Sequence, residues 1–192
     1  MNKRLALIPV TVAAAAALAA CGSSSTKAAP SDTDAAAGSS GCPTAAPAAD
    51  VKPEWTVTGK TGSAEVTGST DTAAPKVTVK GPFTVAETQV HTLKTGTGAV
   101  VGANASVSVC YMGVNGRDGN VFDSAYQRGA PADFSLNGVV PGFSKAIAGQ
   151  KVGSTVAVAM VPADGYPQGQ PDAGIQPTDT LIFAIKILSA NS

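Results

Sequence analysis

The sequence has few of the residues from which common catalytic and metal sites are built. Its 192 residues include a single histidine, His91, which lies in a predicted edge strand. A histidine-based triad and a metal site with several histidines therefore both lack the residues that they require. The glycines that begin at Gly96 miss the dinucleotide-binding fingerprint, because the third glycine falls one position late.

The sequence also lacks an apolar stretch long enough for a convincing transmembrane helix. The stretch from Leu5 to Leu18 is short and rich in alanine, and it follows the basic start Met1-Asn2-Lys3-Arg4. This combination is typical of a secretory signal peptide, here residues 1–20. The end of the stretch, Leu18-Ala19-Ala20-Cys21, resembles the bacterial lipobox. The resemblance implies that the Cys21 thiol is acylated and that lipid anchors the protein to the cell membrane on its extracytoplasmic side.

No excess of positive charge is present either. The chain carries 13 Lys and Arg against 13 Asp and Glu, and the loss of residues 1–20 would leave 11 positive charges, a net charge of −2. A basic patch is the minimum that nucleic-acid binding requires. We therefore expect no nucleic-acid partner, and we expect membrane contact to come from lipid.

The composition divides the chain into segments. Of the 29 positions in 22–50, 21 are Ala, Ser, Gly or Pro. Such a segment cannot bury enough apolar surface to offset its ordering entropy, so residues 21–50 are predicted to be a lipidated cysteine followed by a disordered tether. Residues 51–74 could be a linker or an extra strand, since Trp55 and Val57 alternate with polar residues.

From about residue 75 the pattern changes to short, β-branched runs between glycine-rich turns. The apolar runs 156–161 and 181–188 are the clearest of these. The only fair helical segment is Phe143 to Ala148, which glycines bound on both sides. Residues 75–192 are therefore predicted to form one α+β domain, mostly antiparallel β with one short helix.

A series of ordered landmarks begins at Val109. It runs V-C-Y-M-G, D-G-N-V-F-D-S-A-Y-Q-R-G, G-V-V-P-G-F, G-Q-K-V-G-S and M-V-P-A-D-G-Y-P. This order resembles the FKBP-type peptidyl-prolyl cis-trans isomerases, and the resemblance covers roughly residues 76–190. It implies a half-barrel sheet wrapped around one short helix, an apolar pocket that favours a twisted X-Pro amide, and no cofactor or metal.

The resemblance also implies the residues of the site. The family's catalytic positions and its substrate-binding positions give two groups of residues. The backbone N–H of Val140, in the second group, is expected to donate to a substrate carbonyl. The catalytic positions are Tyr111, Phe122, Asp123, Tyr166 and Phe183, and the substrate-binding positions are Arg128, Val139, Val140, Phe143 and Ile175. Taken singly, the Phe residues could be ordinary core residues and Asp123 with Arg128 an ordinary ion pair. Taken together, and in the order that the family shows, these residues favour a substrate pocket over ordinary core packing.

The sequence departs from the family pattern at the edge of this pocket. Phe143 stands where many members have Trp, Ala132 stands where an aromatic residue is usual, and Gln176 replaces a nonpolar residue. These changes leave the catalytic rate and the affinity for macrolide ligands open.

Two cysteines remain if Cys21 is acylated. Cys42 and Cys110 either pair in a disulfide or both stay free, in a compartment where disulfides persist. Cys110 and Tyr111 are neighbours on a predicted strand, so their side chains point to opposite faces. If Tyr111 faces the pocket, Cys110 faces outward, where Cys42 could reach it.

The function expected from these features is a lipid-anchored, extracytoplasmic prolyl isomerase that assists the folding of secreted or envelope proteins. Its partners would be flexible or unfolded segments that contain proline, and we expect a monomer. The alternative is a non-catalytic chaperone or adaptor on the same fold, which binds proline-containing segments with little turnover, because a fold does not by itself fix a function.

Overall fold

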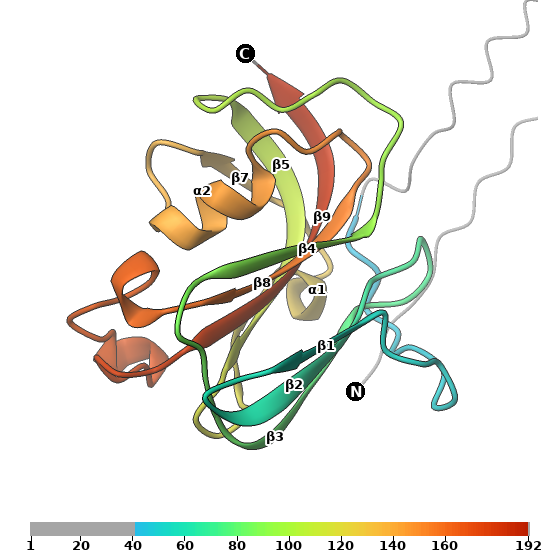
Figure 1. Ribbon diagram of the computed structural model, residues 1–192. Coiled ribbons are helices and arrows are strands. Elements are labelled where there is room, and N and C mark those ends of the chain that lie inside the picture. Colours follow the sequence, from blue (N-terminus) through green and yellow to red (C-terminus); the bar gives the residue numbers. More distant parts are fainter. Residues whose placement is uncertain (1–40, 192) are drawn as a thin grey trace, which may run out of the picture. The chain divides into compact units, whose positions relative to one another are not determined.

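The computed structural model describes residues 41–191, so the expected signal peptide and Cys21 lie outside the described residues. Two antiparallel sheets and four short helical segments make up this part of the chain (Figure 1). The strands are β1 (Trp55–Thr58), β2 (Thr61–Thr67), β3 (Lys76–Thr84), β4 (Gln89–Lys94), β5 (Ser106–Asn115), β6 (Val121–Ser124), β7 (Ala132–Ser135), β8 (Thr155–Met160) and β9 (Leu181–Asn191). The α-helices are α1 (Ala125–Arg128) and α2 (Pro141–Ile147), and the 3-10 helices are η1 (Pro162–Asp164) and η2 (Pro171–Ala173).

The larger sheet has six strands. Five of them follow the order β4-β8-β9-β5-β6, and β7 pairs with β5 beside them. Every pairing in this sheet is antiparallel. The sheet and the short helix α2 confirm the expected fold class, mostly antiparallel β around one helix. Within residues 41–191, no helix is long and apolar enough to cross a membrane.

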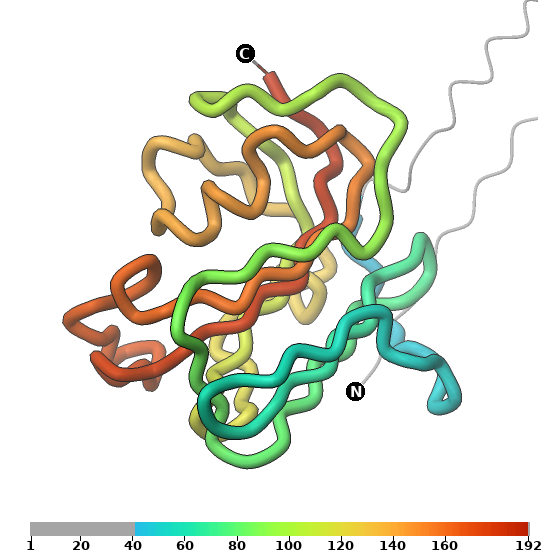
Figure 2. Tube along the Cα trace, in the orientation of Figure 1, coloured from blue at the N-terminus to red at the C-terminus, as the bar shows by residue number. Residues whose placement is uncertain are grey.

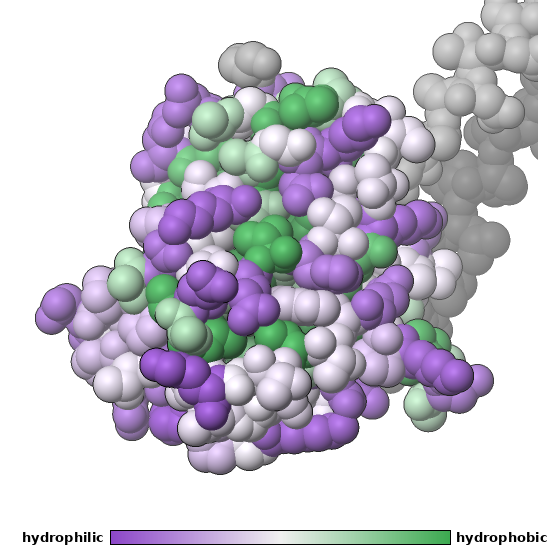
Figure 3. Space-filling model, viewed as in Figure 1, coloured by the Kyte–Doolittle hydropathy of each residue, from purple (hydrophilic) through white to green (hydrophobic). Residues whose placement is uncertain are grey.

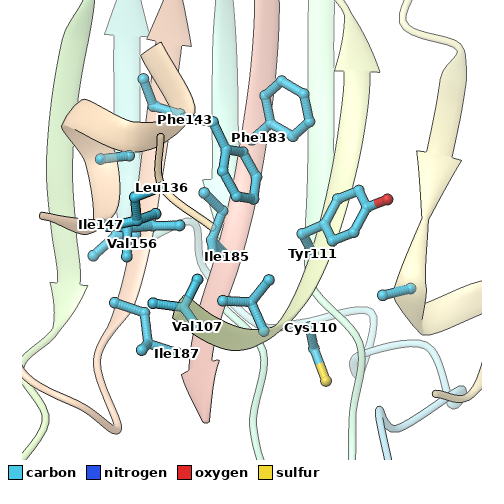
Figure 4. Packing of buried hydrophobic residues seen from close by; sticks show 14 of the residues in the cluster. Val107, Cys110, Tyr111, Leu136, Phe143, Ile147, Val156, Phe183, Ile185 and Ile187 are labelled. Carbon is cyan, nitrogen blue, oxygen red and sulfur yellow. The ribbon is translucent and has the colours of Figure 1, made fainter. Parts of the chain in front are cut away.

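The central strands β8 and β9 are mostly apolar, which matches the burial of both of their faces. All six residues of β8 are buried, and so are the first five of β9. Val156, Val158 and Met160 pack in one cluster with α2, whereas Ala157 and Ala159 pack in a second cluster with β2 and β3. Figure 4 shows part of the first cluster, in which Val156 of β8 lies next to Ile147 of α2.

The second cluster is covered by a separate three-stranded sheet in the order β1-β2-β3. Its buried residues include Val57, Val66 and Phe83. The Trp55 ring stacks on the His91 ring of β4, with centroids 5.6 Å apart and planes at 6°. The segment 51–74, which the sequence leaves open between a linker and an extra strand, thus contains two strands that cover the larger sheet.

Residues 41–50 differ from their expected place in the disordered tether, because the structure places them on the domain. Cys42 forms a disulfide with Cys110 of β5, with Cα atoms 5.7 Å apart, and its side chain is buried. The Cys42 N–H donates to the carbonyl of Gly129, and the Ala45 carbonyl accepts from Ala74. The low-complexity composition gives no sign of these contacts, since a covalent bond and backbone hydrogen bonds hold the segment.

On the face that Figure 3 shows, hydrophobic residues form small patches separated by polar ones. This distribution is ordinary for the surface of a folded domain and gives no sign of a large apolar interface there.

Candidate active site

The helix α2 supplies the floor of a pocket on one face of the larger sheet. Pro141 takes the first helical position, which suits a residue without an N–H. Gly142 lets the helix approach β8 closely, because a Cβ atom there would lie 2.8 Å from the Met160 sulfur. This approach buries Phe143, whose ring lies beside the ring of Phe183 (Figure 4).

Five aromatic rings from different elements surround the pocket. Tyr111 comes from β5, Phe122 from β6, Phe134 from β7, Phe143 from α2 and Phe183 from β9. Most neighbouring pairs meet edge to face, with centroids 5.4–5.8 Å apart, as in the Phe122–Phe183 and Tyr111–Phe143 pairs. Edge-to-face contact places the positive edge of one ring on the negative face of the next, which fixes the walls.

Gly113 of β5 makes room for two of these rings. A Cβ atom on Gly113 would lie 2.6 Å from Cζ of Phe122 and 2.8 Å from Cε1 of Phe183. Such distances require that the rings move. The glycine is part of the V-C-Y-M-G landmark, but its role becomes clear only when β6 and β9 are placed on either side of it.

We expect Gly113→Ala to lower the free energy of unfolding by about 1–3 kcal/mol, the usual cost of overpacking, and to reduce proline-peptide affinity by displacing Phe122 and Phe183. Urea unfolding and peptide titration measure the two effects. Gly102→Ala is the matched control, because a Cβ atom there would meet nothing within 4 Å. Equal stability and affinity in the two variants would contradict the proposed role of Gly113.

The short helix α1 holds a polar cluster at one wall of the pocket. The Ser124 side chain accepts a hydrogen bond from the N–H of Gln127 and so caps the helix, and Gly129 ends it with φ 69°. This turn brings Arg128 back to Asp123, to which it donates a hydrogen bond. Arg128 also donates to the Tyr111 hydroxyl at 3.1 Å, and the Tyr111 hydroxyl donates to Asp123.

The cluster has a defined protonation state. Burial raises the pKa of Tyr111 to about 12, and the hydrogen bond to Asp123 adds to this effect, so the phenol remains a donor. Burial tends to raise the pKa of Asp123, but the hydrogen bonds from Tyr111 and Arg128 outweigh it and hold that pKa below its ordinary value. Asp123 is therefore a carboxylate at neutral pH, and its charge is neutralised by Arg128.

The loop between β8 and β9 closes the pocket from the other side and carries Tyr166. Figure 2 shows this loop, in orange and red, turning back on itself beyond the ends of the strands. Asp179 fixes its far end, accepting hydrogen bonds from Asn115, from Arg117 and from the N–H of Gln176. The resulting pocket has a volume of about 330 Å³.

The structure brings eight of the ten expected site residues to this pocket. Its lining is Tyr111, Phe122, Asp123, Phe134, Gly138, Val139, Val140, Phe143, Tyr166 and Phe183. Arg128 acts on it through Asp123 and Tyr111 rather than by lining it. Ile175 is buried in the core cluster and is not part of the lining.

Two lining residues, Gly138 and Phe134, were not among the expected site residues. Phe134 is the aromatic one. It lies two positions after Ala132 on β7 and faces Val107 of β5. Residues two apart on a strand share a face, so Phe134 supplies an aromatic wall next to the place where Ala132 leaves none. The alternation of Ala132, Asp133 and Phe134 could have indicated this. Among residues 41–191, no group of three or more His, Cys, Asp or Glu could hold a metal ion.

Comparison with known proteins agrees with this geometry. The family model of the FKBP-type peptidyl-prolyl cis-trans isomerases matches residues 98–188. The "Probable FK506-binding protein" of Corynebacterium glutamicum is 37% identical over 98 residues, which are 50% of this chain and 80% of that protein. The "Outer membrane protein MIP" of Legionella longbeachae is 40% identical over 102 residues, which are 53% of this chain and 43% of that protein.

The solved structure of the N-terminal domain of FKBP42 from Arabidopsis thaliana resembles the fold, with a TM-score of 0.52 at 14% identity. The likeness covers 56% of this chain and 88% of that one. The chain spans less than half of the length of several curated relatives that it matches. The chain therefore belongs to the FKBP-type peptidyl-prolyl cis-trans isomerase family, in agreement with the pocket and with the order of the sequence landmarks.

Proposed function

We propose that this chain is a lipid-anchored, extracytoplasmic peptidyl-prolyl cis-trans isomerase that assists the folding of secreted or envelope proteins. The observation that carries the proposal is the aromatic pocket, which combines five rings with a carboxylate and the Tyr166 side chain. A pocket of this kind suits the proline ring and the apolar residue before it. Its substrates would be flexible segments that contain proline.

Catalysis would require no proton transfer and no covalent intermediate. Amide resonance opposes rotation of the X-Pro bond with a barrier of about 18–20 kcal/mol. A twisted amide has less charge separation than a planar one, so a water-poor aromatic pocket favours the twisted form relative to the ground state. The rings of Phe143 and Phe183 would supply this surrounding at the floor.

Two donors would hold the carbonyls on either side of the rotating bond. One is the Tyr166 hydroxyl. The other is the N–H of Val140, which precedes the first turn of α2, where helix N–H groups have no partner within the helix. The Val140 carbonyl is already engaged, because it accepts from the N–H groups of Phe143 and Ser144. The assignment of catalytic and binding roles to these residues is part of the proposal.

A prolyl cis/trans assay on the full chain in detergent tests the activity, over peptides that vary in the residue before proline. We expect acceleration that is largest when this residue is hydrophobic. If the folded chain binds the peptides but does not accelerate their isomerisation, the chain is a non-catalytic binding module and not an isomerase. Gln176, expected at the edge of the pocket, is exposed and does not line it, so it gives this alternative no support.

The disulfide supports the extracytoplasmic location, because disulfides persist in oxidising compartments and are rare in the cytosol. The name of the Legionella longbeachae relative places that protein in an outer membrane. Fatty-acid labelling of cells that express the full chain tests the anchor. We expect label in the wild type and none in Cys21→Ser, and equal labelling of the two would refute acylation at Cys21.

A further inference from the structure

The carboxylate of Asp164 attaches the start of the loop that carries Tyr166 to the rest of the domain. Asp164 ends the 3-10 helix η1, two residues before Tyr166. Both of its oxygens accept from Lys145 of α2 at 2.8 Å, and one also accepts from the Thr88 hydroxyl at 2.5 Å. Asp164 thus connects the start of the loop to the floor helix and to the segment that leads into β4.

Thr88 adds a second attachment at the same place. Its hydroxyl oxygen accepts from the N–H of Val161, the residue before η1, at 3.2 Å. The Asp164 N–H donates in turn to the Val161 carbonyl, and the Gly165 N–H donates to the carbonyl of Pro162. The segment from Val161 to Gly165 is therefore fixed by both side-chain and backbone hydrogen bonds, and Tyr166 is the next residue.

The Asp164 carboxylate does not itself face the substrate. Asp164, Lys145 and Thr88 are not part of the pocket lining, whereas Tyr166 is. The Asp164 side chain is 18% exposed and the Lys145 side chain 57% exposed, so the ion pair is partly solvated at its outer end. An exposed ion pair contributes little to the stability of the fold. The more specific effect of the Asp164–Lys145 pair is on the position of Tyr166.

We propose that Asp164 is a positioning residue: by joining the loop to Lys145 of α2 and to Thr88, it sets where the Tyr166 hydroxyl lies over the pocket. The inference rests on the proposed isomerase function and adds to it a residue that acts only through Tyr166. Donors that must meet a carbonyl during a reaction require close placement, so a small shift of the loop is enough to reduce turnover.

The first test follows Tyr166 directly. The chain has three tyrosines, Tyr111, Tyr126 and Tyr166, so fluorotyrosine labelling gives few resonances in a ¹⁹F NMR spectrum of the full chain in detergent. In Asp164→Asn, which keeps the size of the side chain, and in Thr88→Val, we expect the Tyr166 resonance to shift or broaden while those of Tyr111 and Tyr126 stay in place. An unchanged Tyr166 resonance in both variants would overturn the inference.

The second test is a double-mutant cycle with Tyr166→Phe. We expect Asp164→Asn to lower kcat/KM roughly 5- to 20-fold in the wild-type background and less than about twofold once the Tyr166 hydroxyl is absent. A merely structural role predicts the same loss in both backgrounds, and that result would overturn the inference. Lys80→Met is the matched control, because it breaks a comparably exposed ion pair, with Glu65, on the other sheet.

The two tests also separate this inference from the proposed function. A wild-type chain without turnover would refute the isomerase. The Tyr166 resonance would still show whether Asp164 positions the loop, and the double-mutant cycle would then be measured on peptide affinity.

Discussion

Asp123→Ala is expected to lower kcat/KM for proline peptides roughly 10- to 100-fold, as when a preorganised hydrogen-bonding group is removed from an active site. The variant deletes the carboxylate to which both Tyr111 and Arg128 donate. Without it, the Tyr111 hydroxyl is left in a half-buried aromatic wall beside an unneutralised guanidinium. The ring of Tyr111 contacts three other rings of the pocket, so its displacement reaches Phe134, Phe143 and Phe183.

The prolyl cis/trans assay measures this loss, and circular dichroism shows whether the variant is folded. Asp123→Asn should retain part of the activity, because an amide oxygen can still accept from Tyr111. Asp133→Ala is the matched control, since Asp133 is exposed on β7 and does not line the pocket. Activity within about twofold of wild type in a folded Asp123→Ala chain would show that the carboxylate is only structural.

The protonation state of the cluster predicts a flat pH profile. The pKa of Asp123 lies below its ordinary value. The carboxylate therefore contributes to the stability of the folded state at every pH above the pKa of the unfolded state, and this contribution is lost as the pH falls through the lower pKa of the folded state. The pKa of Tyr111 is about 12. We expect kcat/KM to be constant from about pH 5 to about pH 9, and an inflection inside that range would contradict this assignment.

Removal of the disulfide should have the largest effect on stability. The Cys42–Cys110 bond joins residues 68 positions apart, and such a bond stabilises chiefly by restricting the unfolded chain. In the variant with both Cys42→Ser and Cys110→Ser, the free energy of unfolding should fall by about 2–4 kcal/mol, as measured by urea denaturation. The loss should also free residues 41–50, which the bond holds against β5.

Dithiothreitol supplies the control for this prediction. It should lower the unfolding midpoint of the wild type toward that of the double variant, and it should leave the double variant unchanged. Coincident unfolding curves for oxidised wild type, reduced wild type and the double variant would mean that the backbone hydrogen bonds of Cys42 and Ala45 hold the segment without the disulfide.

The sequence predicted those parts of the fold whose pattern is local. The apolar runs at 156–161 and 181–188 correspond to β8 and β9. The helix expected at 143–148 overlaps α2, which begins two residues earlier, at Pro141, and includes Gly142. The expected pocket positions came from the resemblance to the FKBP-type isomerases that the order of landmarks indicates. Eight of the ten expected residues line the pocket.

The remaining features depend on contacts between distant segments, which composition does not encode. Phe134 enters the pocket because β7 pairs with β5 in one register, and a shift of one residue would turn it away. Residues 41–50 have a tether-like composition and are held by a cysteine 68 positions away. The role of Asp164 requires that η1, α2 and Thr88 meet, although they are far apart in the chain.

Because β8 and β9 are buried on both faces, we expect the two sheets to unfold as one unit. The strands β8 and β9 contribute residues to both hydrophobic cores. Val158 and Ile185 belong to the core under α2, and Ala159 and Ile182 belong to the core under β2 and β3. Neither core can open without exposing apolar surface of the other, so a single cooperative transition joins them. The amides that β8 and β9 share should consequently exchange with solvent only when the whole domain unfolds.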